Sequence, residues 1–312
     1  MGRVQSSLGS VALPHVSRGC HSAGVTADPP DWSGDLEFRP PLLASALLRY
    51  LSARAVPGVE ELDGDTFRRS LRLARGAAVA ELDLRAEAVR LRLWLDDARD
   101  RTAAVACCRR LLGLDTDPSA AAGHLRADPL LAPLVAAAPG LRVPGSVDGP
   151  EVAVRAVLGQ QVSLAAARTA AGRLTAGHGE ALARPRGAVT ALFPSARALA
   201  AVDPARLAMP RGRALALVGL AGAIARGELA LDPGADRAAT RARLLAMRGI
   251  GPWTAGYVAI RALGDPDVFL REDLGVRAAL RALGAEVTPG RAARWAPWRS
   301  HATQYLWQSL AA

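Results

Sequence analysis

The spacing of hydrophobic and polar residues changes near residue 96, and this change divides the chain into two parts. Before it, apolar and polar residues alternate in three runs, at 67–73, 79–84 and 89–95, which predicts strands of an antiparallel sheet with one buried face. After it, apolar residues recur every three or four positions almost to the C-terminus, which predicts helices. We therefore expect an α+β fold, in which a small antiparallel sheet with helices is followed by an all-α part.

The same pattern predicts the order of the helices. One helix is predicted at 42–53, before the sheet, with Leu43, Leu47 and Leu51 on one side. Further helices are predicted at 101–114, 195–207 and 211–225, with two short ones within 120–138 and a long pattern at 152–174 that the residues LGQQVS interrupt. Residues 184–188 are interpreted as a loop, and residues 139–151 as a connector between domains.

A short glycine turn, Gly249-Ile250-Gly251, separates two helical patterns near the C-terminus. A turn this short joins two helices that fold back on each other. Glycine permits backbone conformations closed to other residues, and Pro252 fits the first turn of the second helix. That helix then begins with free N–H groups at the positive end of its dipole, which is an arrangement that binds phosphate. Taken alone, an ordinary helix–turn–helix corner explains the glycines equally well.

One aspartate and several aromatic residues surround this turn. Asp273 precedes a helical run at 276–283, so it is expected to be an N-cap, and a cap position leaves it free to be a catalyst as well. Trp253 and Tyr257 are four residues apart and share a helix face. Aromatic residues at helical spacing usually lie in the core, and we expect this of Trp295 and Trp298.

Together these segments resemble the helix-hairpin-helix DNA glycosylase superfamily, and within it the bacterial DNA-3-methyladenine glycosylase II (AlkA) type most. The resemblance covers roughly residues 36–312. It is carried by VRAVLGQQVSLAAARTAAGRL at 154–174, LFPSARALAAVDPARL at 192–207, LLAMRGIGPWTAGYVAIRALG at 244–264 with FLREDLGV at 269–276, and RWAPWRSHATQYLW at 294–307. Several motifs in one order are far more specific than any single one.

The resemblance implies a division of the chain into domains. It gives residues 1–35 as a disordered or poorly ordered tail, 36–122 as an α+β domain that mostly scaffolds the rest, 149–266 as a helical domain with a wedge loop and the helix-hairpin-helix, and 123–148 with 267–312 as a helical domain that carries the C-terminal wall of the pocket.

The resemblance also implies the roles of individual residues. Asp273 is the catalytic residue, and Trp253, Tyr257 and Trp307 line the base pocket. Gln161 is the wedge that fills the gap left in the duplex by a flipped nucleotide. The alternative for this loop is that Gln160 and Gln161 cap the helix break.

For the hairpin, the resemblance implies contacts with the DNA backbone and with an ion. The phosphate-binding residues are Gly249, Ile250, Gly251, Trp253 and Thr254. A structural monovalent cation, Na⁺ or K⁺, is expected on the main-chain carbonyls of Leu245, Met247 and Ile250.

The implied substrates are alkylated bases in double-stranded DNA, of the 3-methyladenine and 7-methylguanine type. These bases are cationic, so an aromatic pocket attracts them more than neutral bases. Cleavage of the N-glycosidic bond builds positive charge near C1′, which the Asp273 carboxylate can stabilise while it orients a water molecule. A Schiff-base route needs a Lys, and the sequence has none. We therefore predict a monofunctional glycosylase of base excision repair, which leaves an abasic site and has no AP-lyase activity.

The charge of the chain agrees with a DNA partner. The formal net charge is +10 and the pI is near 11.0, which suits a polyanionic partner. All 39 basic residues are Arg, whose guanidinium makes bidentate contacts with phosphate. The arginines at polar strand positions are explained more simply as a solvated face of the sheet. They are Arg68, Arg72, Arg90 and Arg92.

Cysteine content and hydropathy exclude several other classes. The three cysteines Cys20, Cys107 and Cys108 argue against a disulfide scaffold and for a reducing compartment. They are too few for a four-cysteine iron–sulfur cluster, and no Cys/His spacing fits zinc. No stretch is long and apolar enough to span a bilayer. We expect a bacterial cytoplasmic monomer that acts at the nucleoid, contacts no membrane and requires no cofactor.

Two other functions fit the same residues. In a non-catalytic helix-hairpin-helix DNA-binding protein, Asp273 is only a cap and the aromatic residues are only core. A related glycosylase for deaminated or oxidised bases would release neutral bases as well as cationic ones.

Overall fold

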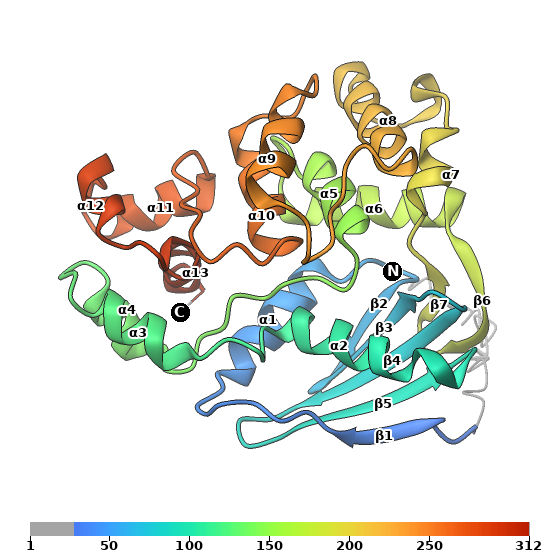
Figure 1. Cartoon of the computed structure of the whole chain (residues 1–312), viewed down its shortest axis with the longest axis horizontal. Coiled ribbons are helices and arrows are strands. Elements are labelled where there is room, and N and C mark those ends of the chain that lie inside the picture. The colour runs from blue at the N-terminus through green and yellow to red at the C-terminus, as the bar shows by residue number, and fades with distance from the viewer. Residues whose placement is uncertain (1–27, 312) are drawn as a thin grey trace, which may run out of the picture.

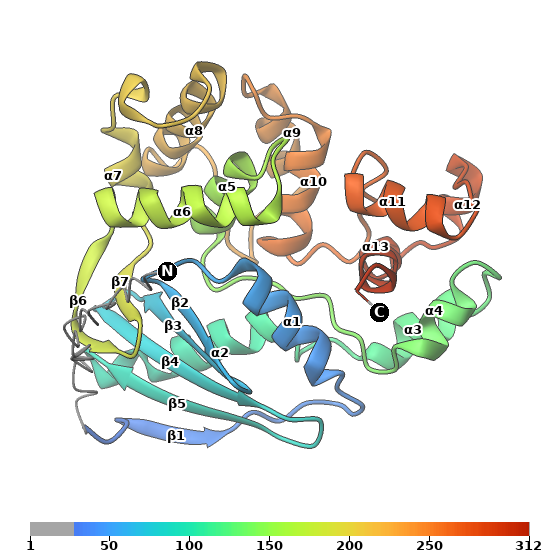
Figure 2. The same ribbon diagram turned by 180° about the vertical axis from the view of Figure 1, so that it is seen from behind.

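The computed structural model of the protein describes residues 28–311, and the expectation for residues 1–27 lies outside this range. A sheet with two helices forms one part of the molecule, and the remaining helices form the other (Figures 1 and 2). No helix within the described residues is both long and apolar enough to cross a membrane.

The N-terminal sheet has five antiparallel strands in the order β1-β5-β4-β3-β2. They are β1 Trp32–Asp35, β2 Glu60–Asp63, β3 Thr66–Arg72, β4 Ala77–Leu84 and β5 Val89–Leu95. The three predicted strands are confirmed, since they are β3, β4 and β5. The prediction of a tail up to residue 35 is wrong for β1, which pairs with β5 so that Trp32 lies opposite Leu93. A strand of four residues is too short for its alternation to be recognised in the sequence.

Helices cover this sheet, and its polar face is internally paired. Helix α1 spans Ala44–Arg54, a 3₁₀ turn spans Ala98–Asp100, and α2 spans Arg101–Leu112. Their apolar faces pack on the strands around Phe67 and Leu91, which are both fully buried. On the opposite face, Arg68 and Arg92 both bind Glu81. The solvated face predicted for these arginines is therefore wrong for Arg68, whose side chain is 21% exposed beside Glu81, while Arg92 is 40% exposed.

The helical part follows the predicted order closely. It contains α3 Pro118–Leu125, α4 Ala132–Ala137, α5 Gly149–Leu158, α6 Leu164–His178, α7 Ala196–Ala200, α8 Arg211–Ala225, α9 Arg237–Ala246, α10 Pro252–Arg261, α11 Leu274–Ala282, α12 Pro289–Ala293 and α13 Arg299–Ser309. The single helix predicted at 195–207 is wrong. It is divided into α7 and a 3₁₀ turn, Pro204–Arg206, because the Asp203 side chain accepts a hydrogen bond from the N–H of Ala205 and starts a new turn before Pro204.

The loop predicted at 184–188 is also wrong, because most of it belongs to a β-hairpin. Strands β6 (Glu180–Arg186) and β7 (Val189–Leu192) pair antiparallel, and Gly187 makes the turn between them with a φ of +56°. The hairpin packs on the N-terminal sheet, where Val189 joins Val79 and Trp94 in a small apolar cluster. The predicted helical segment 149–266 is therefore not all-α. Tertiary contacts rather than local pattern stabilise this hairpin.

Two further apolar cores lie within the helical part. One surrounds α5, α8 and α10 and includes Leu217 and Val258. The other joins α3 and α4 to α11, α12 and α13, and it contains Trp295, which is 1% exposed. Trp298 packs against the same core from a half-buried position. The prediction of both tryptophans as packing residues is confirmed.

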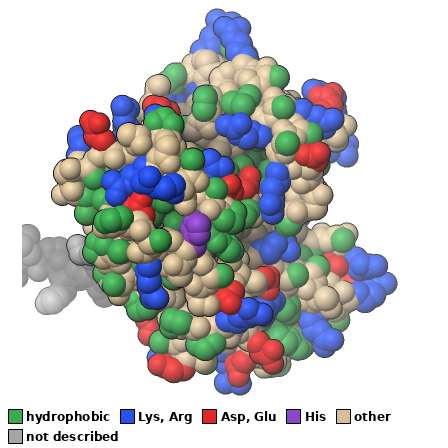
Figure 3. Space-filling model, turned by 60° about the vertical axis from the view of Figure 1, so that its left-hand side comes forward, with side chains coloured by type: hydrophobic (Ala, Val, Ile, Leu, Met, Phe, Trp, Pro, Cys, Tyr) green, Lys and Arg blue, Asp and Glu red, His purple; other side chains and the backbone are tan. Residues whose placement is uncertain are grey.

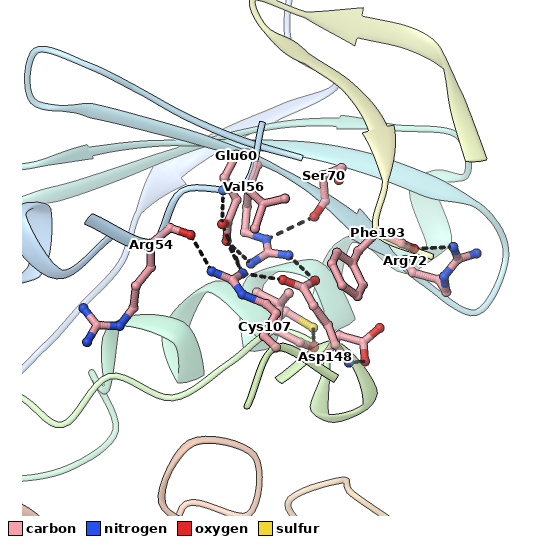
Figure 4. A network of polar contacts seen from close by, with 12 residues as sticks. Arg54, Val56, Glu60, Ser70, Arg72, Cys107, Asp148 and Phe193 are labelled. Atoms are coloured by element: carbon pink, nitrogen blue, oxygen red, sulfur yellow. Dashed lines mark hydrogen bonds and ion pairs between the residues drawn. The ribbon is translucent and has the colours of Figure 1, made fainter. Parts of the chain in front are cut away.

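A buried cluster of charges connects the sheet to the helical part (Figure 4). Arg69 on β3 binds Glu60 on β2 at 2.7 Å and Glu151 on α5 at 2.8 Å. Arg155, one turn further along α5, binds the same two carboxylates at 3.1 and 2.7 Å. Burial alone raises the pKa of Glu151, but the guanidinium groups of Arg69 and Arg155 outweigh it and hold the pKa below its usual value. Two acids and two bases thus compensate each other inside the protein.

Arg155 also fixes the end of α1, because its Nη2 donates to the carbonyl of Arg54 at 2.6 Å. Arg155→Met should remove both ion pairs and leave Glu60 and Glu151 sharing one cation. We expect a loss of about 3–5 kcal/mol in the free energy of unfolding measured in urea, as for other broken buried ion pairs.

The control for this prediction is Arg226→Met, which removes an exposed pair with Glu228. Its urea midpoint should stay unchanged, since exposed ion pairs contribute little. Equal midpoints for the two variants and the wild type would show that the buried cluster does not join the two parts.

Candidate active site

Asp273 is the N-cap of α11, as the sequence predicted. Its Oδ1 accepts a hydrogen bond of 2.8 Å from the N–H of Val276. The cap fixes the aspartate at the end of the segment that links α10 to α11 (Figure 1). A side chain bonded in this way has little rotational freedom, which suits a group that must face a reacting atom.

Two indole groups hold the other sides of the same carboxylate. Trp253 on α10 donates its Nε1–H to Oδ2 of Asp273 at 2.7 Å, and Trp307 on α13 donates to Oδ1 at 2.8 Å. The sequence predicted that these tryptophans lie near Asp273, but it did not predict the hydrogen bonds. Three helices therefore position one carboxylate, and both of its oxygens accept hydrogen bonds.

The three aromatic residues and Asp273 line one cavity of about 350 Å³. Trp253 and Tyr257 are stacked with ring centres 5.5 Å apart, and Tyr257 and Trp307 are tilted with centres 6.4 Å apart. The structure thus brings together the four residues that the sequence assigned to catalysis and to the base pocket. The acid and the rings therefore face one common space, although the two indoles contact the acid directly.

Gly275 is a residue of this site that the sequence did not single out. A Cβ atom at this position would lie 3.0 Å from Oδ1 of Asp273 and 3.0 Å from Cδ1 of Trp307. Glycine therefore allows the close approach of the indole to the carboxylate. The triplet Asp273-Leu274-Gly275 gives no indication of this contact. The indole belongs to α13, which is far away in the sequence.

Two polar residues of α1 also line the cavity, and sequence reasoning missed both of them. They are Tyr50 and Arg54, which come from the N-terminal domain. The guanidinium carbon of Arg54 lies 4.2 Å from the centre of the Tyr50 ring. The N-terminal domain therefore contributes to the pocket wall in addition to its scaffolding role.

Arg261 is a buried cation beside the aromatic residues, on α10 one turn after Tyr257. Arg261 is only 1% exposed. Its guanidinium carbon lies 4.7, 5.6 and 5.1 Å from the ring centres of Tyr50, Tyr257 and Trp307. The four-residue spacing from Tyr257 could have indicated its position in the sequence.

The hydroxyl of Tyr257 has an unusual electrostatic environment. The Tyr50 hydroxyl and the Arg54 guanidinium are its neighbours. Burial raises the pKa of Tyr257, but Arg54, Arg261 and Tyr50 outweigh it and lower the pKa to about 8. Burial raises the pKa of Tyr50.

The loop between α5 and α6 carries the predicted wedge. Gln161 is exposed and has a φ of +55°, a backbone conformation that L-residues rarely adopt. The cap of α6 is Ser163, whose side chain accepts from the N–H of Ala166. Gln160 instead donates to the carbonyl of Gly249 at 3.0 Å and to the Thr254 hydroxyl at 2.9 Å. The loop is thus tied to the glycine hairpin, and capping by the two glutamines is not observed.

The hairpin presents free donors, as the sequence predicted for a helix start. Within the described residues, the main-chain N–H groups of Gly251, Trp253 and Thr254 have no acceptor. Gly249 has a φ of +84°. Ile250 differs from the expectation, because its N–H donates to the carbonyl of Met247 at 3.1 Å and its side chain is buried. Ile250 therefore anchors the turn and leaves its neighbours to face a phosphate.

The expected ion has only main-chain oxygens available at this turn. The Met247 carbonyl already accepts the hydrogen bond from Ile250, but a carbonyl oxygen has a second lone pair. Oxygen donors of this kind suit a hard monovalent cation, and the site on Leu245, Met247 and Ile250 stays a prediction. Within residues 28–311, no group of three or more His, Cys, Asp or Glu side chains could hold a metal ion.

The surface around the site is basic and hollowed. Figure 3 shows Arg side chains on both sides of a hollow in one face of the molecule. Arg168 on α6 lines the cavity, together with Val162 and Leu164, whose side chains are unusually exposed for their type. A hollow with cationic side chains at its edges and exposed apolar side chains nearby is typical of a surface that binds a nucleic acid.

Sequence comparisons agree with these features. The model of the AlkA N-terminal domain matches residues 34–148. DNA-3-methyladenine glycosylase 2 of Escherichia coli is 35% identical over 277 residues, which cover 87% of this chain and 95% of the relative. The chain belongs to the DNA-3-methyladenine glycosylase 2 (AlkA) family. A protein of Mycobacterium tuberculosis named "Probable bifunctional transcriptional activator/DNA repair enzyme AlkA" is 47% identical over 279 residues. The chain spans 56% of the length of that relative, and the match covers 88% of the chain.

Solved structures show the same fold as this AlkA-family chain. The 3-methyladenine DNA glycosylase from Archaeoglobus fulgidus has a TM-score of 0.74 at 21% identity, covering 88% of this chain and 97% of that one. An 8-oxoguanine glycosylase/lyase of Clostridium acetobutylicum in complex with double-stranded DNA has a TM-score of 0.70 at 16% identity, covering 91% and 99%. The α+β prediction with its helix-hairpin-helix part is therefore confirmed.

Gly275→Ala tests the tight packing of Trp307 on Asp273 in this AlkA-family site. The added methyl should displace the indole and lengthen its hydrogen bond by a few tenths of an ångström. We expect altered near-UV circular dichroism and a crystal structure in which the Trp307 ring has moved. A free energy of unfolding lower by about 1–3 kcal/mol should accompany this, as for overpacked sites.

Gly290→Ala is the matched control, because Gly290 is also the second residue of its helix and has no atoms near the added methyl. At this position, alanine should leave the near-UV circular dichroism spectrum unchanged. It should raise the free energy of unfolding by up to about 1 kcal/mol through its higher helix propensity. The same gain for Gly275→Ala would show that the position is not tightly packed.

Proposed function

We propose that this protein is a monofunctional DNA glycosylase that excises alkylated bases of the 3-methyladenine and 7-methylguanine type from double-stranded DNA. It flips the damaged nucleotide out of the duplex, hydrolyses the N-glycosidic bond and leaves an abasic site for base excision repair. The observation that carries this proposal is the Asp273 carboxylate, held by two indoles at the wall of a ring-lined cavity. Membership of the AlkA family supports it.

The cavity suits a planar base. A flipped base enters between the aromatic residues and stacks on Trp253, Tyr257 or Trp307. Rings of this kind bind a cationic base through their negative faces as well as through contact area. The base is then held while the sugar remains at the mouth, on the side of Asp273.

Asp273 acts on the sugar during bond cleavage. Departure of the base leaves an oxocarbenium-like sugar with positive charge near C1′. A carboxylate fixed by three N–H donors stabilises this charge without having to reorganise. It also orients the water molecule that attacks C1′. A cationic base leaves as a neutral molecule, so no second acid has to protonate it.

The hairpin and the wedge loop hold the duplex. The free N–H groups of Gly251, Trp253 and Thr254 bind a backbone phosphate at the positive end of α10. Gln161 enters the duplex from its exposed position and fills the gap beside the unpaired partner base. The hydrogen bonds from Gln160 keep these two contacts in a fixed relation.

The remaining properties follow from this function. A monovalent cation on the carbonyls of Leu245, Met247 and Ile250 would rigidify the turn and add positive charge near the phosphate. The protein works as a monomer in the cytoplasm, at the bacterial nucleoid, and requires no cofactor for the reaction. Without a Lys in the sequence, no side chain can form the Schiff base of a lyase.

Asp273→Asn tests the mechanism. The amide keeps the cap at Val276 but carries no charge, so single-turnover release of 3-methyladenine should fall by about 10²–10³-fold, as for other lost electrostatic contacts. Release is measured by chromatography of the free base from methylated DNA, and strand cleavage only after alkali shows that no lyase acts.

Glu272→Gln is the control for this variant, because it removes the same charge one residue away from an exposed position. Its rate should equal that of the wild type. Full activity of Asp273→Asn would remove the proposed mechanism. Binding of the DNA by the wild type without any release would instead favour a non-catalytic DNA-binding protein.

Gln161→Gly tests the wedge separately from stability. Glycine tolerates the φ of +55° better than glutamine does, so the unfolding free energy should be equal or slightly higher. Release of 3-methyladenine should nevertheless fall by about tenfold or more, since unstacking costs a few kcal/mol that the wedge offsets. Unchanged release from the duplex would show that Gln161 does not enter it. Single-stranded methylated DNA, which has less stacking to disrupt, serves as the comparison.

A further inference from the structure

The cavity contains a titratable group that the hydrolysis does not require, the hydroxyl of Tyr257. Tyr50 and Arg54, which both belong to α1, are its neighbours. Tyr50, Arg54 and Tyr257 all line the space that also holds Asp273, and the guanidinium carbon of Arg261 lies 5.6 Å from the centre of the Tyr257 ring. A base that stacks on Tyr257 would therefore lie close to a hydroxyl that has cationic neighbours.

Arg261 places a second positive charge on the same group of rings. Its side chain is almost fully buried, and its guanidinium donates to two neutral acceptors, the Pro144 carbonyl at 2.6 Å and the Gln304 side chain at 3.0 Å. Within residues 28–311, neither Arg261 nor Arg54 forms a salt bridge with a carboxylate. Asp148 and Asp273 line the same cavity, so these two cations have acids nearby but no ion-pair partner of their own.

These charges conflict with the binding of a cationic base. A positively charged base on Trp253 and Tyr257 would be a third cation in a largely enclosed space. Asp273 offers one negative charge, which the two indoles already engage. The buried cluster that shares this cavity is balanced within itself. It consists of Glu60, Arg69, Glu151 and Arg155.

We propose that Tyr257 releases its hydroxyl proton when a cationic base enters the cavity and keeps it when the base is neutral. The O–H bond of Tyr257 breaks, and the proton passes to water in the cavity and then to the solvent. The phenolate oxygen stays beside Tyr50 and Arg54. The pocket thereby adjusts its charge to the charge of the base. This role of Tyr257 rests on the proposed function and adds a means by which one pocket takes both cationic and neutral damaged bases.

In the free protein, the pKa of the Tyr257 hydroxyl is already close to neutral pH. The guanidinium groups and Tyr50 lower the pKa of Tyr257 to about 8 against the effect of burial, so near neutral pH the proton is mostly present. A cation that stacks on the ring favours the phenolate and moves the midpoint further down. The charged or titratable neighbours of Tyr257 are Tyr50 and Arg54 from α1, Arg261 from its own helix and Asp273 at the start of α11, while α13 contributes the uncharged Trp307 and Gln304. Asp148 before α5, Arg168 on α6 and the balanced cluster around Arg155 line the same cavity.

Tyrosine NMR tests the exchange directly, because the chain has only three Tyr. The protein is labelled with ¹³C at Cζ of tyrosine and titrated between about pH 6 and 10. The Tyr257 midpoint should lie near 8 in the free protein. Saturation with the 3,9-dimethyladeninium ion, whose charge is fixed, should lower it by about one pH unit or more. Neutral 9-methylhypoxanthine should leave it in place. An unchanged midpoint with a bound cation, seen from shifted pocket signals, would overturn the proposal.

Release rates give a second and independent test. It decides the question even when the free bases bind too weakly for the NMR titration. The single-turnover ratio of 3-methyladenine to hypoxanthine release is measured against pH for the wild type and for Tyr257→Phe. The wild-type ratio should rise with pH up to about 8, as the phenolate becomes easier to form. The variant ratio should be independent of pH and about tenfold lower at pH 8, which corresponds to a shift of one pKa unit.

Two more variants complete the design. Tyr50→Phe removes a hydroxyl that lowers the pKa of Tyr257, so the rise in the ratio should move to higher pH. Tyr305→Phe is the control, because Tyr305 is buried in the core of the other helical cluster, and it should reproduce the wild-type ratio. If the wild type releases neither base, the proposed function fails. If it releases both and Tyr257→Phe shows the same pH dependence, only the role of Tyr257 fails.

Discussion

The structure depends on one carboxylate that three helices share. Asp273 caps α11 and receives indole N–H groups from Trp253 on α10 and Trp307 on α13. Helix α10 packs in one apolar core, while α11 and α13 pack in another. The hydrogen bonds of Asp273 therefore lie where the two cores meet, and they set the separation between the rings. A group placed in this way is oriented before any ligand arrives, which is the condition for electrostatic stabilisation of a transition state.

The same carboxylate has a structural role that limits substitution at this position. Removal of the side chain deprives α11 of its cap and leaves two indole N–H groups without an acceptor, so loss of function and loss of order are linked. The buried cluster around Arg155 has a comparable role on the other side of the cavity. It holds the end of α1 and thereby positions Tyr50 and Arg54 against the rings. The N-terminal domain is thus part of the pocket, although nothing near α1 in the sequence suggests chemistry.

Local pattern and long-range contact explain which features could be predicted from the sequence. The hairpin, the cap at Asp273 and the shared face of Trp253 and Tyr257 depend on residues a few positions apart, and spacing alone indicates them. Gly275 and the two residues of α1 matter only through contacts with distant helices, so no local signal exists for them. The same reason accounts for the wrong interpretations. Strand β1 and the hairpin β6–β7 are short and take their stability from pairing and packing with the N-terminal sheet, whereas the long amphipathic helices carry their own periodic signal.

The position of Arg261 weakens the attraction that the aromatic rings would have for a cationic base. Aromatic rings attract a cationic base through their electron-rich faces, but here a buried guanidinium already lies near three of those rings. The ring faces therefore interact with Arg261 as well as with a bound cationic base. By themselves they discriminate only weakly between cationic and neutral bases. Under the proposed function, two other properties then carry the selectivity. One is the ease with which a cationic base leaves the sugar, which no contact with the protein has to supply. The other is the proposed release of the Tyr257 proton, which adds a negative charge to the cavity when a cationic base is bound.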